Sequence, residues 1–151
     1  MKKIVIETNS EEETISTGFN FAKNLVQGSS IAFYGDLGSG KTEFIKGICD
    51  YFQVDEIVSS PTFTLVNKYI AMKDDFEFPI FHIDLYRIKN TRELEEIGLR
   101  EILESDESIK LMEWAEKTFN YFESYDFKIQ ITFDDLIESK RSISISDKNS
   151  Y

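Results

Sequence analysis

Apolar and polar positions along this chain change period repeatedly, from runs of strand length to helical stripes. Apolar, β-branched and aromatic residues that run together or alternate predict strands at residues 1–7, 30–34, 62–70, 80–84, 109–113, 127–133 and 142–146. Helical spacing predicts helices at about 10–25, 41–52 and 91–103. Because strands and helices interleave, we expect a three-layer α/β domain with a mixed, mainly parallel central sheet and antiparallel additions.

The first predicted helix carries its own start signal. Ser10 and Glu13 have the S-x-x-E spacing of a capping box, in which the Ser10 side chain accepts a hydrogen bond from a backbone N–H of the first turn. The apolar stripe that should face the sheet consists of Ile15, Phe19, Ala22 and Val26. No internal repeat, low-complexity segment or Pro/Gly-rich linker interrupts the chain, so we expect residues 1–151 to form a single domain.

The strand predicted at 30–34 runs directly into GDLGSGKT, residues 35–42, which matches the phosphate-binding loop pattern G-x-x-x-x-G-K-[ST]. Its glycines let the backbone curl so that successive N–H groups point at one anion. Lys41 can place its ammonium against the β- and γ-phosphates, and the Thr42 hydroxyl can ligate Mg²⁺. The helix that begins near Lys41 adds its positive N-terminal end. We therefore predict a P-loop NTPase-like domain. Its nucleoside triphosphate site would include Gly35, Asp36, Leu37, Gly38, Ser39, Gly40, Lys41, Thr42 and Glu43.

Two predicted strands end in a carboxylate. Asp84 closes the strand at 80–84, and Glu113 closes the strand at 109–113. Ligands of such sheets bind at the carboxyl edge, so each acid can deliver an oxygen to the nucleotide. One of them could hold Mg²⁺ while the other orients or deprotonates the attacking water. The sequence leaves these roles interchangeable, and either acid taken alone could instead cap a turn or pair with Arg87.

Three further residues are candidates beside these acids. Thr62 follows Pro61 in a segment placed like a switch loop, where its hydroxyl would reach the γ-phosphate side, although a plain turn fits equally well. His82, the only histidine, lies in an apolar strand and is expected to be hydrogen-bonded structurally rather than to act as a general base. Trp114 directly follows Glu113 and packs either in the core or over the nucleotide site.

Charge and cysteine usage narrow the function classes. The net charge is −11, with 28 acidic and 17 basic residues, which argues against unaided binding of nucleic acid. The single cysteine, Cys49, allows no internal disulfide and fits a reducing cytoplasm. No apolar run approaches the ~20 residues of a membrane span. We therefore expect a cytoplasmic protein without a membrane partner, whose nucleic-acid substrate, if it has one, is held by another subunit.

Five segments in this order resemble the TsaE (YjeE) family, the bacterial ATPase of tRNA threonylcarbamoyladenosine biosynthesis. They are GDLGSGKTEF (35–44), SPTFTLVNKY (60–69), HIDLYRI (82–88), ELEEIGLREIL (93–103) and MEWAE (112–116). The phosphate loop alone is not specific, but the combination is, and it spans nearly the whole chain. The chain departs from the family pattern at Ala115, where the family more often has proline, and in its C-terminal region.

The resemblance implies a Mg²⁺-dependent ATPase that is weak alone and docks on the TsaB–TsaD pair. Its ATP cycle would let that assembly turn over as it transfers a threonylcarbamoyl group to the adenosine beside the anticodon. The tRNA would then be held by the partners, in agreement with the acidic composition of this chain.

The resemblance also assigns roles to individual residues. Lys41 would contact phosphate, Thr42 and Asp84 would hold Mg²⁺, and Glu113 would be the metal-proximal acid needed for hydrolysis. The family's switch segment includes Thr62, and Trp114 would be a functional neighbour of Glu113. Further nucleotide contacts near the first helix and at a late arginine match Ser10, Glu11 and Arg141.

Other functions share the phosphate loop. A small-molecule kinase would need a cavity for its acceptor and usually an arginine-bearing lid, and no lid segment stands out. A GTP-driven switch would need an N-K-x-D pattern, but the segment that begins at Asn67 lacks the aspartate and falls too early. A module that binds nucleotide without hydrolysing it is the third alternative.

Overall fold

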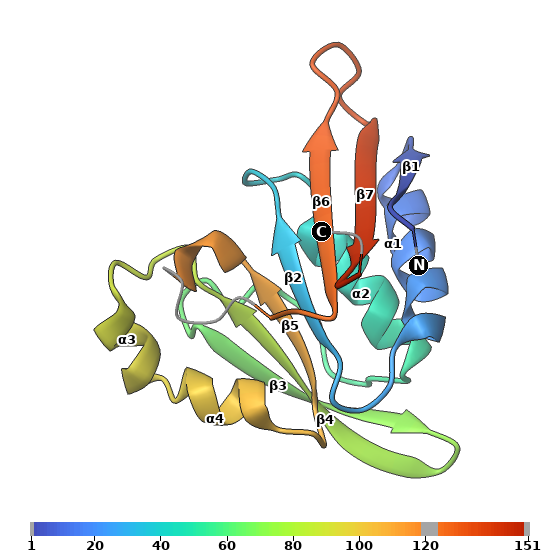
Figure 1. The fold of residues 1–151 in the computed structure, drawn as a ribbon. Helices are drawn as coiled ribbons and strands as arrows, with labels where there is room; N and C mark the ends of the chain where they lie inside the picture. Colours follow the sequence, from blue (N-terminus) through green and yellow to red (C-terminus); the bar gives the residue numbers. More distant parts are fainter. Residues whose placement is uncertain (1, 119–123, 150–151) are drawn as a thin grey trace.

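The computed structural model describes residues 2–118 and 124–149. In this part of the chain one sheet of seven strands has the order β1-β7-β6-β2-β5-β4-β3 (Figure 1). The strands are β1 (Ile4–Thr8), β2 (Ser30–Tyr34), β3 (Val66–Lys73), β4 (Phe76–Asp84), β5 (Ile109–Glu113), β6 (Phe127–Phe133) and β7 (Arg141–Asp147). The helices are α1 (Glu11–Phe21), α2 (Lys41–Tyr51), α3 (Thr91–Glu96) and α4 (Leu99–Glu104), with 3-10 turns η1 (Ala22–Asn24) and η2 (Ala115–Thr118).

The centre of the sheet is parallel and its margins are antiparallel. Strands β6, β2, β5 and β4 pair in parallel. At the margins, β3 runs antiparallel to β4, β7 to β6, and β1 to β7. The predicted fold class, a mainly parallel sheet with antiparallel additions, is confirmed. In this arrangement the carboxyl ends of β2, β4, β5 and β6 lie along one edge of the sheet.

Alternation along the strands divides the core into two layers on opposite faces of the sheet. On β2, Ile31 and Phe33 join the cluster beneath α2, whereas Ala32 between them joins the cluster beneath α3 and α4. On β6 and β7 the central inward positions are isoleucines, and the positions between them are polar. The inward isoleucines are Ile129, Ile131, Ile143 and Ile145.

The two helices on the first face cross at a glycine on each. A Cβ on Gly18 of α1 would lie 2.9 Å from the carbonyl carbon of Phe44, and a Cβ on Gly47 of α2 would lie 2.6 Å from the backbone nitrogen of Phe19. Only glycine permits this approach, because any side chain would occupy the space of the opposite backbone. Helix α1 therefore packs on α2 through Gly18, which is not part of the predicted apolar stripe, as well as through Ile15 and Phe19, which are.

The predicted stripe of α1 is accordingly wrong in part. Thr14, Gly18 and Phe21 are the buried positions of this helix, while Phe19 is 40% exposed. Of the remaining predicted positions, Ile15 is half-buried, Ala22 is buried in η1 and Val26, beyond the helix, is 68% exposed. The stripe assumed packing on a sheet, whereas α1 packs on α2 around Gly18, and the Phe19 ring meets Tyr51 of α2 while it stays partly exposed.

Several predicted boundaries also differ, two of them at a residue in the left-handed region. The helix predicted at 91–103 is divided into α3 and α4 by Gly98, whose φ is 71°. The strand predicted at 62–70 begins only at Val66, because Leu65 has φ 68° and its N–H donates to the carbonyl of Pro61 at 2.7 Å. The strand predicted at 80–84 begins already at Phe76, directly after a turn at Asp74 and Asp75, both with positive φ.

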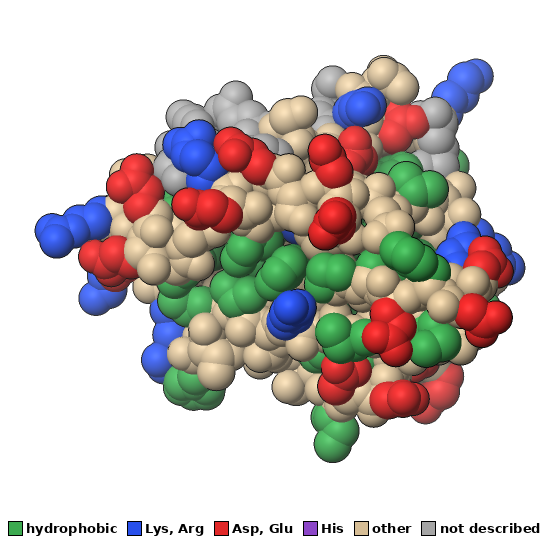
Figure 2. Space-filling model, turned by 90° about the horizontal axis from the view of Figure 1, so that it is seen from below, with side chains coloured by type: hydrophobic (Ala, Val, Ile, Leu, Met, Phe, Trp, Pro, Cys, Tyr) green, Lys and Arg blue, Asp and Glu red, His purple; other side chains and the backbone are tan. Residues whose placement is uncertain are grey.

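The underside of the molecule, seen in Figure 2, carries hydrophobic side chains in a band between acidic and basic ones. At this end of the sheet the loop before β2 and the β3–β4 turn line a hollow of about 280 Å³. Val26 and Phe76 contribute to it and are 68% and 59% exposed. Among the described residues, no helix is both long and apolar enough to cross a membrane.

Candidate functional site

The ends of three parallel strands bring the candidate residues together. In the sheet register Phe33 of β2 lies beside Glu113 of β5, and Glu113 lies beside Asp84 of β4. The glycine loop, residues 35–40, leaves β2 at this edge and leads into α2. The glycine loop and both strand-end carboxylates therefore lie at the same edge of the sheet, as expected for acids that end parallel strands.

The glycine loop has a backbone that only glycines adopt readily. Gly35, Gly38 and Gly40 have φ of 146°, 76° and 109°. A Cβ at Gly35 would also lie 2.6 Å from the Oγ of Ser39 and still closer to the carbonyl oxygen of Ile131. The curled loop thus depends on Gly35 for space as well as for conformation.

The start of α2 lacks the side-chain cap that α1 and α3 have. Ser10 caps α1 and Asn90 caps α3 with a side-chain oxygen, whereas Gly40 at the start of α2 has no side chain to do so. The first N–H groups of a helix have no partner within it. At α2 they remain for a ligand, and their positive end favours an anion such as phosphate. The capping by Ser10 was predicted, and its Oγ accepts from Glu13 N at 3.1 Å.

Lys41 is held inside the loop that precedes it. Its Nζ donates to the carbonyl oxygens of Gly35 and Asp36, the latter at 3.1 Å, and lies 4.5 Å from the ring centroid of Trp114. Burial lowers the pKa of Lys41, while the negative charges of Glu113 and Asp84 oppose that shift. The ammonium is thus partly dehydrated and aimed at the space over the loop, where an anionic ligand would replace the carbonyl contacts.

The two strand-end carboxylates are buried and joined by hydroxyl groups. Asp84 Oδ2 accepts hydrogen bonds from Ser60 Oγ at 2.7 Å and Thr62 Oγ1 at 3.1 Å, and its Oδ1 accepts from the backbone N–H of Tyr86 at 2.8 Å. Ser60 Oγ also lies 3.5 Å from Glu113 Oε2. The segment around Thr62, which the sequence places like a switch loop, is therefore hydrogen-bonded to a carboxylate of the site.

These groups line one pocket of about 200 Å³. It contains Leu37, Gly38, Ser39, Gly40, Lys41, Thr42, Glu43, Ser60, Thr62, Asp84, Glu113 and Trp114. Two carboxylates and the Thr42 hydroxyl are oxygen ligands of the kind that Mg²⁺ takes together with nucleotide phosphates. Within the described residues, no group of three or more Asp, Glu, His or Cys side chains could hold a metal by itself. The donor set therefore fits a Mg²⁺ that arrives with a phosphate ligand.

Trp114 has a conformation that the sequence did not indicate. Its φ is 58°, which is uncommon for a bulky residue, and its ring lies 4.9 Å from that of Tyr86. Strained residues of this kind cluster at functional sites. Trp114 packs partly against the core cluster beneath α3 and α4 and also lines the small pocket, so its position combines the two alternatives.

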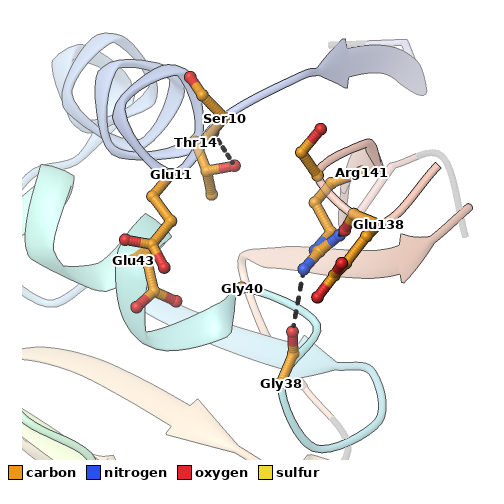
Figure 3. A pocket seen from close by; sticks show the side chains of 9 residues that line it. Ser10, Glu11, Thr14, Gly38, Gly40, Glu43, Glu138 and Arg141 are labelled. Atoms are coloured by element: carbon orange, nitrogen blue, oxygen red, sulfur yellow. Dashed lines mark hydrogen bonds between the residues drawn. The ribbon is translucent and has the colours of Figure 1, made fainter.

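A larger pocket of about 440 Å³ lies on the other flank of the glycine loop (Figure 3). Its predicted members are Ser10, Glu11, Gly38, Gly40, Glu43 and Arg141. In Figure 3 the Arg141 side chain from β7 reaches toward the loop, where Nη2 donates to the carbonyl of Gly38 at 3.4 Å. The start of α1, the loop and β7, which are far apart in sequence, thus form one concave wall of a size suited to a small molecule.

Several lining residues were not predicted. Ser60 precedes Pro61 and looks like a turn residue. Only the hydrogen bond that it donates to Asp84 in the structure identifies it as a residue of the site. Thr14, Glu138 and Ser139 line the larger pocket, but no sequence pattern joins them to the loop. His82 was expected to be hydrogen-bonded in the interior, and the structure confirms this, with Glu113 as one of its partners.

Comparisons with known proteins identify relatives of this chain. The family model described as "Threonylcarbamoyl adenosine biosynthesis protein TsaE" matches residues 8–143. A protein of Rickettsia bellii named tRNA threonylcarbamoyladenosine biosynthesis protein TsaE is 40% identical over 72% of this chain and 72% of its own. The protein of the same name from Borreliella burgdorferi is 36% identical over 75% of this chain and 79% of its own.

A solved structure is similar over almost the entire fold. The crystal structure of Bacillus subtilis YdiB superposes with a TM-score of 0.76 at 27% sequence identity, and the match covers 97% of this chain and 86% of YdiB. The family model covers both the glycine loop and the two strand-end carboxylates. On these similarities the chain belongs to the TsaE family.

Proposed function

We propose that this protein is a Mg²⁺-dependent ATPase that supports the synthesis of threonylcarbamoyladenosine in tRNA, acting together with TsaB and TsaD. The pathway comes from the names of its relatives, which are called tRNA threonylcarbamoyladenosine biosynthesis proteins. The ATPase activity and the partners follow from the resemblance and from the site. The single cysteine and a tRNA substrate favour the cytoplasm as the place of action.

One observation carries the proposal: a phosphate-binding loop and two carboxylates line the same small pocket. Lys41, Asp84 and Glu113 come from three different elements, yet all face the space of about 200 Å³ at the uncapped start of α2. A nucleotide-binding module without chemistry would need the loop but would not need a second buried acid. This convergence supports hydrolysis over storage of the nucleotide.

Each residue has a definable task in phosphoryl transfer to water. The N–H groups at the start of α2 and the Lys41 ammonium would bind the phosphates, since both present positive charge to one point. Thr42 and Asp84 would hold Mg²⁺, which when bound neutralises charge that develops on the phosphate oxygens. Glu113 would orient the attacking water and accept its proton. Trp114, 4.5 Å from Lys41 Nζ, would limit the positions open to that ammonium.

The larger pocket would take the remainder of the nucleotide. It adjoins the loop at Gly38 and Gly40, so a triphosphate bound at α2 could extend its sugar and base toward α1 and Arg141. The carboxylates of Glu11, Glu43 and Glu138 lie there as hydrogen-bond acceptors for an amino group. This extension agrees with the roles that the resemblance implies for Ser10, Glu11 and Arg141.

The experiment that tests the proposal is reconstituted tRNA modification with TsaB and TsaD of the same organism. Product per complex and free phosphate would be followed with the wild-type chain, with Lys41→Ala, and without the chain. Lys23→Ala is the matched control, because Lys23 is an exposed lysine whose Nζ donates to the side chain of Asn20, away from both pockets. We expect product to stall after the first turnover unless wild type or Lys23→Ala is present with ATP. Equal sustained turnover in every reaction would refute the proposal, and phosphate transferred to an acceptor would instead indicate a kinase.

A further inference from the structure

The candidate catalytic carboxylate is one end of a buried row of three hydrogen-bonded side chains. The Tyr69 hydroxyl lies 3.1 Å from Nδ1 of His82, and Nε2 of His82 lies 2.7 Å from Oε2 of Glu113. The exposed fractions of these residues are 3%, 0% and 3%. His82 belongs to β4, Tyr69 to β3 and Glu113 to β5, so three neighbouring strands meet in this contact.

The donors and acceptors present indicate the direction of these hydrogen bonds. A carboxylate only accepts, so the Nε2 atom of His82 carries the proton that points at Glu113. The Tyr69 hydroxyl lies 3.1 Å from Nδ1 of His82 and 3.3 Å from the carbonyl oxygen of Ser59, so its one proton has two acceptors within reach. Nδ2 of Asn67 also lies 3.3 Å from that carbonyl and supplies it with a donor, which leaves the Tyr69 proton for Nδ1 and gives the imidazole the Nε2–H form.

This bond uses only one of the two oxygens of Glu113. Oε2 receives the hydrogen bond from His82, whereas Oε1 makes none with any described residue. Glu113 lines the small pocket, so the second oxygen is left for a ligand there. A carboxylate held by one oxygen has a defined rotation and a defined free lone pair, which is the requirement for orienting a water molecule.

We propose that His82 is a positioning residue for Glu113, with Tyr69 keeping its imidazole in the Nε2–H form. The inference rests on the proposed function, since it assigns to His82 the task of aiming the acid used in hydrolysis. His82 is fully buried and is not among the residues that line the small pocket, so it would act on a bound nucleotide only through Glu113. Loss of its Nε2–H should therefore slow the chemical step and leave ATP binding intact.

Two amide substitutions separate positioning from packing. In His82→Gln the side-chain amide nitrogen falls near the former Nε2 and can donate to Glu113, whereas in His82→Asn it falls near the former Nδ1 and cannot. We expect His82→Asn to lower kcat about 10- to 100-fold in the reconstituted complex, as loss of a supporting partner commonly does, with the Kd for ATP changed less than about threefold. His82→Gln should recover most of the loss. Equal kcat values for the two variants, with both folded by circular dichroism, would overturn the inference.

A second readout needs no activity. His82 is the only histidine of the chain, so a long-range proton–nitrogen NMR spectrum contains one imidazole. We expect the Nε2–H form, with slow exchange of its proton with solvent. In Glu113→Ala we expect that exchange to become fast. An Nδ1–H form would overturn the inference even where ATP hydrolysis is normal. Conversely, absent hydrolysis by the wild-type chain, with the Nε2–H form seen, would refute the proposed function and with it the positioning role.

Discussion

Replacing Gly47 by alanine tests the glycine crossing of α1 and α2. The new Cβ would lie 2.6 Å from the backbone nitrogen of Phe19 and closer still to the carbonyl oxygen of Ile15, where ordinary contacts begin near 3.4 Å. Both atoms belong to the backbone of α1, so no side-chain rotation relieves the overlap. The helices must separate by more than an ångström, and the aromatic packing of Phe21 against Phe44 must open with them.

Two opposing effects set the size of the change. Alanine in a helix interior is favoured over glycine by about 1 kcal/mol. Overpacking of a tight core costs about 1–3 kcal/mol or somewhat more, and a clash with backbone belongs at the upper end. The steric effect therefore wins, and we expect Gly47→Ala to lower the free energy of unfolding by roughly 2 kcal/mol. For a domain of this length that corresponds to a fall in Tm of about 4–8 °C.

Urea unfolding followed by far-UV circular dichroism measures this difference. Ser16→Ala is the matched control, because Ser16 is exposed on α1 and gains helix propensity without meeting α2. We expect that control to stay within about 0.5 kcal/mol of wild type. A Gly47→Ala protein as stable as wild type, with an unchanged denaturant slope, would show that the helices lie farther apart than described here.

Three further predictions concern the candidate site and the core. Asp84→Asn should make ATP binding nearly independent of added Mg²⁺ and slow hydrolysis at least ~10-fold. Titration calorimetry with and without Mg²⁺ measures the first effect, and phosphate release measures the second. An unchanged dependence of ATP binding on Mg²⁺ would argue against Asp84 as a metal ligand. Trp114, the only tryptophan, should change its fluorescence when ATP draws Lys41 Nζ away from its ring, and Lys41→Ala should abolish that change. Burial raises the pKa of Cys49 to about 12, so at pH 8 only about one thiol in ten thousand is ionised and the folded protein should react with a disulfide reagent only as it unfolds. Rapid labelling of the native protein would contradict this burial.

Much of the site could be predicted because its positions follow from strand periodicity. An apolar run that ends in an acid places that acid at the sheet edge, and the observed register puts Asp84 beside Glu113. The glycine loop has fixed spacing, so its residues could be named before the fold was known. The contact partners were harder to predict, because Ser60 reaches Asp84 from a loop whose path depends on the left-handed conformation of Leu65.

The fold was predictable in class but less so in its helix packing. The stripe of α1 treats every apolar residue as a candidate for the core, but a helix–helix crossing is selected by the absence of a side chain. Gly18 and Gly47 gave no apolar signal, and their pairing joins positions on two different helices. Gly98, in contrast, carried a local signal for a helix break, which the acidic helical pattern around it concealed.

The pairing of β1 with β7 has a consequence for the order in which the protein forms during synthesis. Ile4 lies opposite Ile145, so the first strand to leave the ribosome waits for the last one before it can join the sheet. Strand β5, which carries Glu113, pairs with β2, and β4, which carries Asp84, pairs with β5, so neither strand needs β7. Arg141, however, belongs to β7 itself. A nascent chain would therefore assemble the small pocket first and complete the larger one only when its last strand has been made.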